Sequence, residues 1–479
     1  MEEDRDRHET EVDLPYLTLD EALEKTKIGF YQYRLLVLCG LAFMTDSLEV
    51  NLLSFLSVCA GKEWDLTSEQ EASITGIVFA GIICGSGFWG VLSDRYGRKR
   101  AFILATVIIT IGGVLTGFAP SFPLLLFFRA IVGFGIGGAN VPFDLLAELL
   151  PASQRGCFLV YIEFFWTFGS ILVAGLAWAC LSQNGWRTLA LLTVIPVAIT
   201  SFFSVVYLPE SPRWLMEVGR NEDAKKILLE TARVNGVTLP PFQLRNEIPE
   251  HHGDIDYFAI VSRKKLRAVT IPLWLVWAGF GCTYYGIILF ITRLYDTSSD
   301  DDSDTCTFDY SSIFYNSLSE VGAVLLNGLV LESVGRVRMQ FYFYLLAGFT
   351  VVMMGISMPT GALIAVGIVG RISIMIASVR TILSFSLSLL ILFPSSSQNT
   401  TWVSTPELYP TEYRTVGHAS CVSFSKIGAL LSPYIVISSL SPMVVGVILG
   451  IVNVVAAISS WNLPETTGTS SSFEQYKSF

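Results

Sequence analysis

The chain has 479 residues, of which 52% are hydrophobic and only 15% are charged, and its mean hydropathy is +0.55. This composition excludes an ordinary soluble enzyme and indicates an all-α membrane protein embedded in a lipid bilayer. The net charge of −10 comes without a basic stripe outside the loops between apolar runs, so no nucleic-acid binding is expected.

Apolar runs of about 17–25 residues, the length that crosses a bilayer, follow one another along the chain. After a cytoplasmic N-terminal segment (1–34), an N-terminal bundle (35–208) is predicted to contain spans at 35–59, 72–92, 101–118, 123–150, 158–181 and 188–208. A cytoplasmic linker loop (209–267) separates it from a C-terminal bundle (268–461) with spans at 269–292, 313–331, 339–358, 362–378, 416–440 and 443–461, and a cytoplasmic tail (462–479) follows. We therefore predict twelve transmembrane helices in two six-helix bundles.

Basic residues are distributed unevenly between the two sets of loops. If both termini are cytoplasmic, the inner loops hold 18 Lys and Arg residues, whereas the outer loops hold only Lys62, Arg187 and Arg293. This asymmetry follows the positive-inside rule. We expect a multi-pass integral membrane protein with both termini in the cytoplasm, in the plasma membrane or an intracellular vesicle membrane.

Three charged motifs occur once in each half of the chain. Each follows an apolar run of membrane-spanning length, and the first pair is separated by 238 residues. Duplicated six-helix halves with charges on one membrane face are typical of a transporter. The pairs are Asp94–Arg100 with Glu332–Arg336, Glu148–Gly156 with Glu407–Gly417, and Pro209–Arg213 with Pro464–Gly468.

Charged residues inside the predicted spans are the stronger functional signal. A charge at the centre of a transmembrane helix costs about 2.5–3.5 kcal/mol on insertion scales, so it tends to have a partner or face water. Asp46 and Glu49 are three residues apart and share one face of the first span, while Arg129 lies in the fourth. Glu49 is expected to face cavity water.

Four further polar residues are candidates for the site. Asn140 and Asp144 lie four residues apart in the fourth span, and Asp144 is either a second titrating site or a counter-ion for a cationic substrate. Arg371 in the tenth span echoes Arg129 and is a candidate clamp for a carboxylate substrate. Lys426 in the eleventh span either binds substrate or extends to the inner surface.

Aromatic residues and cysteines are the remaining candidates for a functional role. Trp166, Tyr284 and Tyr285 are predicted to offer rings to a midplane cavity. The eight cysteines show no metal-ligand spacing, so neither a metal nor a cofactor is expected. Cys59 and Cys306 fall near the outer face, where they are either free thiols or a bridge that would tie the two halves across an outer gate.

Several motifs resemble the major facilitator superfamily. Gly90–Arg100 resembles the signature of the loop after its second helix, Arg129–Gly135 resembles its fourth-helix motif, and Pro209–Trp214 is typical of its sugar-porter and organic-ion branches. Other segments are most similar to synaptic-vesicle-two-related proteins and to niacin and organic-ion transporters: Phe30–Arg34, Asp46–Glu49, Tyr284–Gly286 and Pro406–Arg414. The resemblance extends from about residue 16 to 468 and implies two pseudo-symmetric bundles that rock about a midplane cavity.

The resemblance also implies two charged devices. In proton-coupled sugar porters, an aspartate in the first helix faces an arginine in the fourth, which here implies a protonatable pair of Asp46 and Arg129; the alternative is a static ion pair that locks two helices together. The resemblance implies that charged residues at the inner helix ends form a cytoplasmic gate, which is closed when the outer side opens. The alternative is that these residues only enforce the topology. These residues are Asp94, Arg98, Glu148, Arg155, Arg213, Glu332, Arg336, Glu407 and Arg414.

The sequence of the seventh span narrows the class of substrate that is expected. Hexose porters carry a run of amide side chains there, whereas Trp277–Tyr285 contains none. Rings together with Asp or Arg suit an aromatic acid or an organic cation better than a sugar. One segment departs from the family pattern, because about 17–21 extra residues, most simply 379–399, lie between Arg371 and Glu407 and would disrupt the tenth helix.

Together these features predict a secondary active transporter, a monomer that works as a proton-coupled symporter of a small organic ion by alternating access. No enzyme is indicated, because the chain carries no nucleophile elbow, phosphate-binding loop or metal set. The alternative is a non-transporting receptor or vesicle-trafficking membrane protein on the same scaffold, which the disrupted tenth helix would favour.

Overall fold

The computed structural model describes residues 15–138, 140–245, 258–297, 306–334, 336–378, 405, 408–409 and 413–464. The segment 379–399, predicted to be an insertion, and the gate residue Glu407 therefore lie outside the described residues. The side chains of Asn140, Glu332, Arg336 and Arg414 also lie outside them.

The first bundle follows the predicted spans. Its helices are α2 (Phe30–Glu63), α3 (Ser68–Tyr96), α4 (Arg98–Gly117), α5 (Phe122–Ile136), α6 (Asn140–Glu148) and α7 (Ala152–Tyr207). The long α7 contains the fifth and sixth spans, separated at Gly185, which adopts φ 74°. Glycine reaches this left-handed region without Cβ crowding, so the chain can reverse there.

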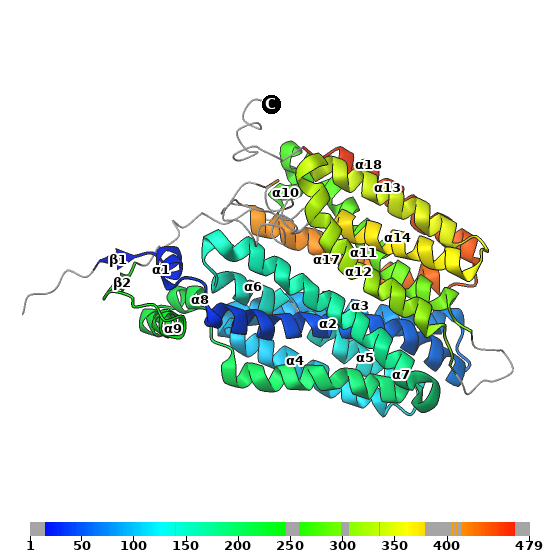
Figure 1. Cartoon of the computed structure of the whole chain (residues 1–479), viewed down its shortest axis with the longest axis horizontal. Coiled ribbons are helices and arrows are strands. Elements are labelled where there is room, and N and C mark those ends of the chain that lie inside the picture. The colour runs from blue at the N-terminus through cyan, green and yellow to red at the C-terminus, as the bar shows by residue number, and fades with distance from the viewer. Residues whose placement is uncertain are drawn as a thin grey trace, which may run out of the picture.

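The second bundle is built in the same way. It contains α11 (Lys264–Leu294), α12 (Tyr310–Val334), α13 (Arg336–Met354), α14 (Thr360–Ser378), α17 (Arg414–Val436) and α18 (Pro442–Trp461). Figure 1 shows this bundle lying against the first, and both are helical throughout their described spans. The predicted fold class, an all-α membrane protein of two bundles, is confirmed.

The fourth span is broken, which the sequence pattern did not predict. Pro142 has no N–H to donate to the carbonyl of Gly138, and the indole nitrogen of Trp89 donates to the carbonyl of Phe134 at 2.7 Å. A Cβ at Gly137 would lie only 2.5 Å from the backbone nitrogen of Ser86 on α3. Tight packing against α3 and the missing donor together divide the span into α5 and α6.

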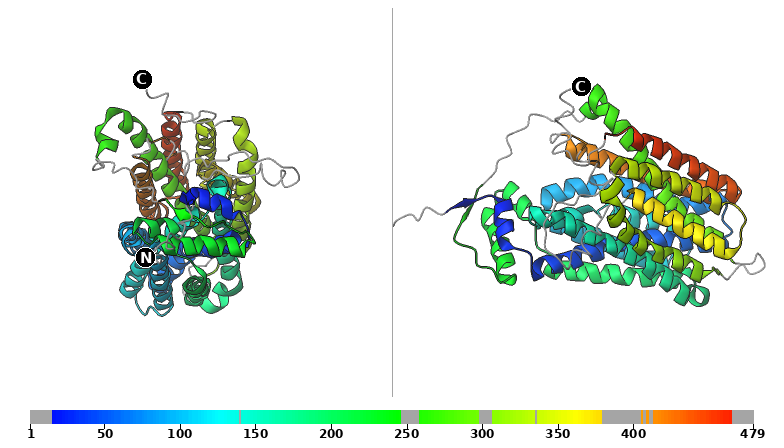
Figure 2. Two further views of the ribbon diagram at one scale, coloured as in Figure 1. Left: turned by 90° about the vertical axis from the view of Figure 1, so that its left-hand side faces the viewer. Right: turned by 45° about the horizontal axis from the view of Figure 1, so that its top comes forward.

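A small unit lies at one end of the bundles (Figures 1 and 2). It consists of β1 (Tyr16–Leu17), α1 (Leu19–Thr26), α8 (Pro212–Glu217), α9 (Asn221–Val234) and β2 (Gln243–Leu244). The two strands pair in parallel, and their partners include Leu17 with Leu244. Leu23, Leu228 and Phe242 form its core, so the N-terminal segment and the linker fold together. The short α10 (Ala259–Ser262) then leads into α11.

The two bundles share one core at the end opposite to this unit, which we call the outer end. That core combines residues such as Phe55 and Val78 of the first bundle with Ile287 and Leu449 of the second. Toward the small unit the core divides into separate clusters, one confined to the first bundle and one to the second. The halves are therefore packed together at the outer end and separate at the inner end.

The outside of the bundles is apolar. Side chains such as Phe202, Val205, Ile451 and Ile458 are each more than half exposed, and they belong to helices long and apolar enough to cross a membrane. Soluble monomers rarely expose patches of this kind, whereas lipid tails cover them at no cost.

Candidate functional site

A cavity lies where the bundles meet. It is framed by α2 and α7 of the first bundle and by α11, α14 and α17 of the second. Its lining residues are Phe43, Asp46, Glu163, Trp166, Trp277, Phe280, Tyr284, Tyr285, Met375, Val422, Ser425 and Lys426. Five of the predicted site residues, Asp46 with the substrate-binding candidates Trp166, Tyr284, Tyr285 and Lys426, are thus brought together at one cavity.

Three ionisable side chains with carboxylate or ammonium groups face this cavity. Asp46 is only 6% exposed, and its Oδ1 atom has no hydrogen-bond partner in the described part of the chain. The ammonium of Lys426 lies near enough to attract the Asp46 carboxylate, and it donates to the hydroxyl of Tyr285 at 3.4 Å. Glu163 is the third, and sequence reasoning missed it. The sequence signal that could have identified Glu163 is its acidic side chain inside the predicted apolar span 158–181.

The expected pairing of Asp46 with Arg129 is wrong. Arg129 Nη1 instead donates to Glu49 Oε2 at 2.9 Å, and the two side chains are 0% and 1% exposed. Arg129 Nε donates to Thr116 on α4 at 3.0 Å. Glu49 therefore faces a partner rather than cavity water. The geometry provides a fully buried acid–base pair beside the cavity, with Asp46 left to interact with Lys426.

The second bundle contains a comparable buried pair. Arg371 on α14 lies 2.8 Å from Glu320 on α12, so it is not available in this structure as a clamp for a substrate carboxylate. Glu320 Oε1 also accepts from Tyr284 at 3.2 Å, and Tyr284 accepts from the indole nitrogen of Trp166 at 2.5 Å. This chain of contacts crosses from the second bundle to the first. Sequence reasoning missed Glu320, although it is an acid inside the predicted span 313–331.

Asp94, Arg98 and Glu148 of the predicted cytoplasmic gate pair within the first bundle. Arg98 binds Asp94 at 2.5 Å and Glu148 at 3.6 Å, and Trp214 donates its indole N–H to the carbonyl of Asp94 at 2.7 Å. Asp144, predicted near the coupling site, is instead exposed on α6, close enough to interact with Arg98 and Glu148. In the described part of the chain, no ion pair joins the two bundles at this inner end.

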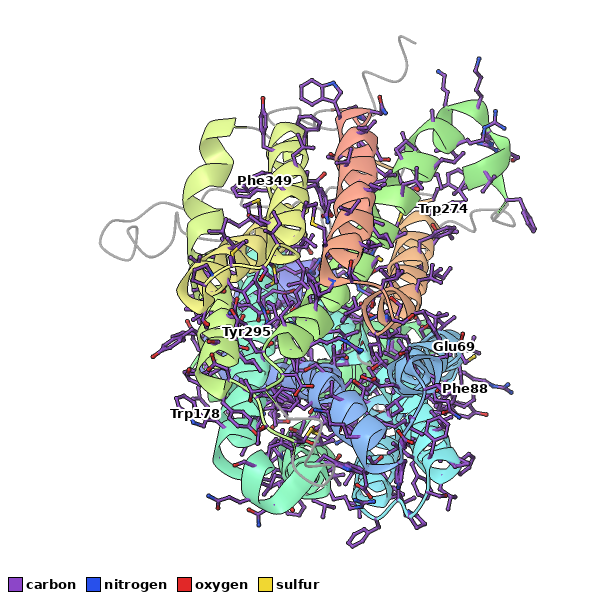
Figure 3. All side chains as sticks on the ribbon, turned by 90° about the vertical axis from the view of Figure 1, so that its right-hand side faces the viewer. Glu69, Phe88, Trp178, Trp274, Tyr295 and Phe349 are labelled. Carbon is purple, nitrogen blue, oxygen red and sulfur yellow. A yellow bond between two sulfur atoms is a disulfide. The ribbon has the colours of Figure 1, made fainter. Side chains whose placement is uncertain are left out.

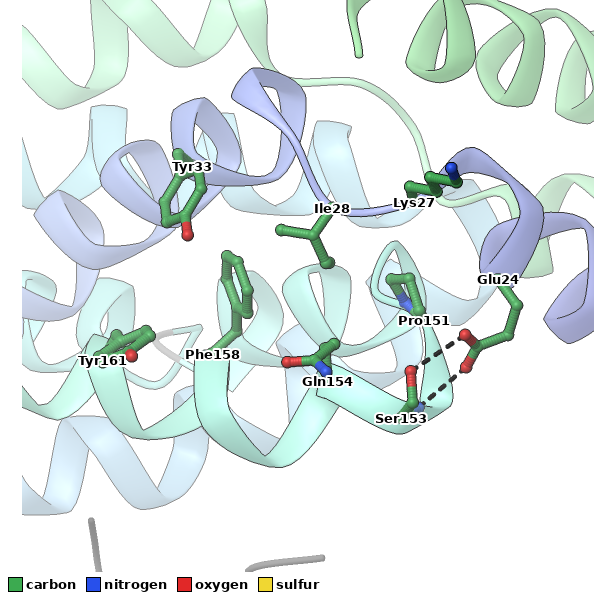
Figure 4. A pocket seen from close by; sticks show the side chains of 9 residues that line it. All are labelled: Glu24, Lys27, Ile28, Tyr33, Pro151, Ser153, Gln154, Phe158 and Tyr161. Atoms are coloured by element: carbon green, nitrogen blue, oxygen red, sulfur yellow. Dashed lines mark hydrogen bonds between the residues drawn. The ribbon is translucent and has the colours of Figure 1, made fainter. Parts of the chain in front are cut away.

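Helix α1 fastens the small unit to the first bundle. Asp20 accepts from two of the predicted gate arginines, Arg155 at 3.3 Å and Arg213 at 3.5 Å. The Glu24 carboxylate accepts from the backbone nitrogen of Ser153 at 2.9 Å and from its hydroxyl at 3.0 Å, beside a groove between α1, α2 and α7 (Figure 4). A carboxylate at the N-terminus of α7 is favoured by the free N–H groups there.

The outer end carries contacts that join the bundles. A disulfide links Cys59 of α2 to Cys306, with their Cα atoms 5.6 Å apart. Lys62 binds Asp296 at 3.1 Å, and Arg293 binds Glu71 at 3.4 Å. Figure 3 views the molecule from this end. These links show that the bundles are closed to each other on the outer side.

Asp309, three residues after Cys306, caps the start of α12. Its carboxylate accepts from the backbone nitrogen of Ser312 at 3.2 Å and from the hydroxyl of Ser311 at 2.7 Å, which caps α12. Burial opposes ionisation, but these hydrogen bonds outweigh it and lower the pKa of Asp309 below its usual value.

Two helical bundles closed to each other at one end, with a cavity lined by ionisable residues between them, are the architecture of a membrane transporter. The comparison with protein families agrees: residues 35–478 match the model of the sugar (and other) transporter family. The chain belongs to this family, within the major facilitator superfamily.

Known relatives agree with this assignment. The Caenorhabditis elegans protein svop-1 is 34% identical over 470 residues, covering 94% of this chain and 86% of that protein. The synaptic vesicle 2-related protein of Xenopus laevis is 30% identical (87% and 75% covered), and the organic cation/carnitine transporter 7 of Arabidopsis thaliana is 28% identical (88% of each).

Among solved structures, a partially occluded inward-open xylose transporter XylE from E. coli superposes with a TM-score of 0.67. It is 18% identical and covers 92% of this chain and all of the XylE chain, which supports the fold.

Proposed function

We propose that this protein is a proton-coupled secondary active transporter of a small organic ion. The observation that carries the proposal is the cavity between the bundles, where Asp46, Glu163 and Lys426 face aromatic rings. A ligand bound there would touch both bundles at once, so its binding can favour one arrangement of the bundles over another. The substrate enters and leaves by alternating access.

Asp46 is the proton-coupling group in this proposal. Its buried carboxylate faces the cavity and is attracted by Lys426 from the opposite bundle. Protonation would remove that attraction and weaken a contact between the bundles. The Glu49–Arg129 pair supports the first bundle beside it, because both charges are fully buried and mutually compensated.

Alternating access also requires a cytoplasmic gate that opens when the outer side is closed. The structure has the contacts expected of a closed outer side, and the inner-end residues Asp94, Arg98 and Glu148 pair within their own bundle. In the outward-facing state these groups would pair instead with charged residues of the second bundle. We place both termini in the cytoplasm, with the protein a monomer in the plasma membrane or a vesicle membrane.

The substrate class rests on the lining. The described part of α11 that lines the cavity presents rings rather than amides, which suits an aromatic acid or an organic cation better than a sugar. The name of the Arabidopsis relative, an organic cation/carnitine transporter, favours the cation.

Uptake into liposomes tests the coupling. The purified full chain is reconstituted, and a panel of labelled organic acids and cations is offered with and without an inward proton gradient. Asp46→Asn should abolish gradient-driven accumulation and spare exchange of the same solute. Unaltered accumulation by this variant would remove Asp46 from the mechanism.

The disulfide favours a second candidate function. A covalent link between Cys59 and Cys306 holds the outer ends together, which would stop alternation in an oxidising compartment. A receptor or trafficking protein would need no such alternation. Liposome uptake that is absent for every solute, both with and without a thiol reductant, would support this alternative.

A further inference from the structure

Glu163 differs from the buried acids Asp46, Glu49 and Glu320. Glu49 and Glu320 each have an arginine within 2.9 Å, and Asp46 is attracted by Lys426. Glu163 is half-buried and faces the same cavity, yet in the described part of the chain it has no hydrogen bond or ion pair. A carboxylate partly removed from water and without a partner is costly, and a cation bound in the cavity would remove that cost by pairing with it.

The charge balance of the cavity follows from these contacts. With all three groups ionised, the lining carries two carboxylates, Asp46 and Glu163, and one ammonium, Lys426. Lys426 attracts the Asp46 carboxylate and donates to the hydroxyl of Tyr285. One negative charge therefore remains, and it is located at Glu163.

Three of the donors on aromatic side chains in the same lining are already engaged within the protein. The indole N–H of Trp166 donates to Tyr284, that of Trp277 donates to Thr405 at 3.0 Å, and the Tyr284 hydroxyl donates to Glu320. The indole rings can then offer only their faces, which attract a cation and repel an anion.

We propose that Glu163 is the charge-selecting residue of this cavity, which binds a flat organic cation and rejects the anion of the same size. The inference rests on the proposed function and names the substrate class for it. The positive group of the ligand would lie against the Glu163 carboxylate, with its ring between the aromatic side chains.

A pair of probes that differ mainly in charge gives the test. Labelled 1-methylnicotinamide, a pyridinium cation, and nicotinate, an anion built on the same ring, are titrated against the purified full chain by scintillation proximity at one pH and without a gradient. The wild type should bind the cation more tightly than the anion. Glu163→Gln, which keeps the shape, should weaken cation binding roughly 10- to 100-fold, and nicotinate binding should stay equal or become tighter.

Two variants keep the result interpretable. Glu69→Gln, at an exposed position near the start of α3, is the matched control and should change neither affinity. Glu163→Asp retains the charge and should keep the preference for the cation, even if Glu163→Gln folds poorly. A cation affinity in Glu163→Gln within two-fold of wild type, tighter binding of nicotinate by wild type, or binding of neither probe would each overturn the proposal. Cation binding without gradient-driven uptake would instead refute the proposed function and leave the selectivity standing.

Discussion

The buried pair of Glu49 and Arg129 gives the sharpest prediction about stability. Glu49→Gln keeps the side-chain shape but leaves the Arg129 guanidinium uncompensated at 0% exposure. At the observed 2.9 Å separation and an effective dielectric constant of about 20, the lost attraction is about 6 kcal/mol. The amide oxygen and Thr116 would recover part of it, so we expect a decrease of about 3 kcal/mol in the free energy of unfolding.

The double variant separates an uncompensated charge from lost packing. Replacing both partners together, as in Glu49→Leu with Arg129→Met, removes the ion pair and both desolvation costs, so its stability should lie within about 1 kcal/mol of wild type. Unfolding in a denaturing detergent, followed by tryptophan fluorescence, measures all three proteins, with Glu69→Gln as the control. A Glu49→Gln variant as stable as Glu69→Gln would refute the reasoning, because it would mean that water or another group compensates Arg129.

Three further predictions concern the two ends of the molecule. Cys59→Ser should speed the exchange of labelled 1-methylnicotinamide across liposome membranes, and exchange by this variant should no longer respond to a dithiol reductant. An equal response to the reductant in wild type and variant would contradict an outer link to Cys306. Asp309→Ala should lower the stability of α12 by about 1 kcal/mol at neutral pH. Because the folded pKa of Asp309 is lowered, this difference should vanish as pH falls through that pKa, and a pH-independent loss would argue against the cap. Asn235→Ala removes hydrogen bonds to the carbonyls of Thr26 and Lys27, so amide hydrogen exchange around the α1–α2 corner should quicken, and unchanged exchange would show that the corner holds without it.

The sequence was sufficient to predict the fold because span length and loop charge are local properties. Each apolar run must satisfy its own backbone hydrogen bonds in lipid, so the run itself specifies a helix. The break between α5 and α6 was not predictable in the same way. It depends on Gly137 meeting the backbone of α3 and on Trp89 capturing a carbonyl, and both contacts come from another helix.

The identity of ion-pair partners needed the structure. Asp46 and Glu49 share a helix face, so the sequence alone cannot say which one meets Arg129. Thr116 on α4 contributes to the choice, because its hydroxyl accepts from Arg129 Nε and holds the guanidinium beside Glu49. A Cβ at Gly113 on the same helix would lie 2.5 Å from Val194, so the close approach of α4 to α7 near this pair depends on a residue 64 positions from Glu49 in sequence.

The two halves of the internal repeat use their corresponding buried arginines differently. Arg129 and Arg371 occupy corresponding helices, but Arg129 pairs with an acid of the first helix of its bundle and Arg371 with an acid of the second. The first pair is enclosed within its own bundle. The second is linked through Tyr284 to Trp166 across the interface, so separating the bundles there would break a hydrogen bond to the Glu320–Arg371 pair. Within the described residues, only the second of these two pairs is positioned to respond directly when one bundle moves against the other.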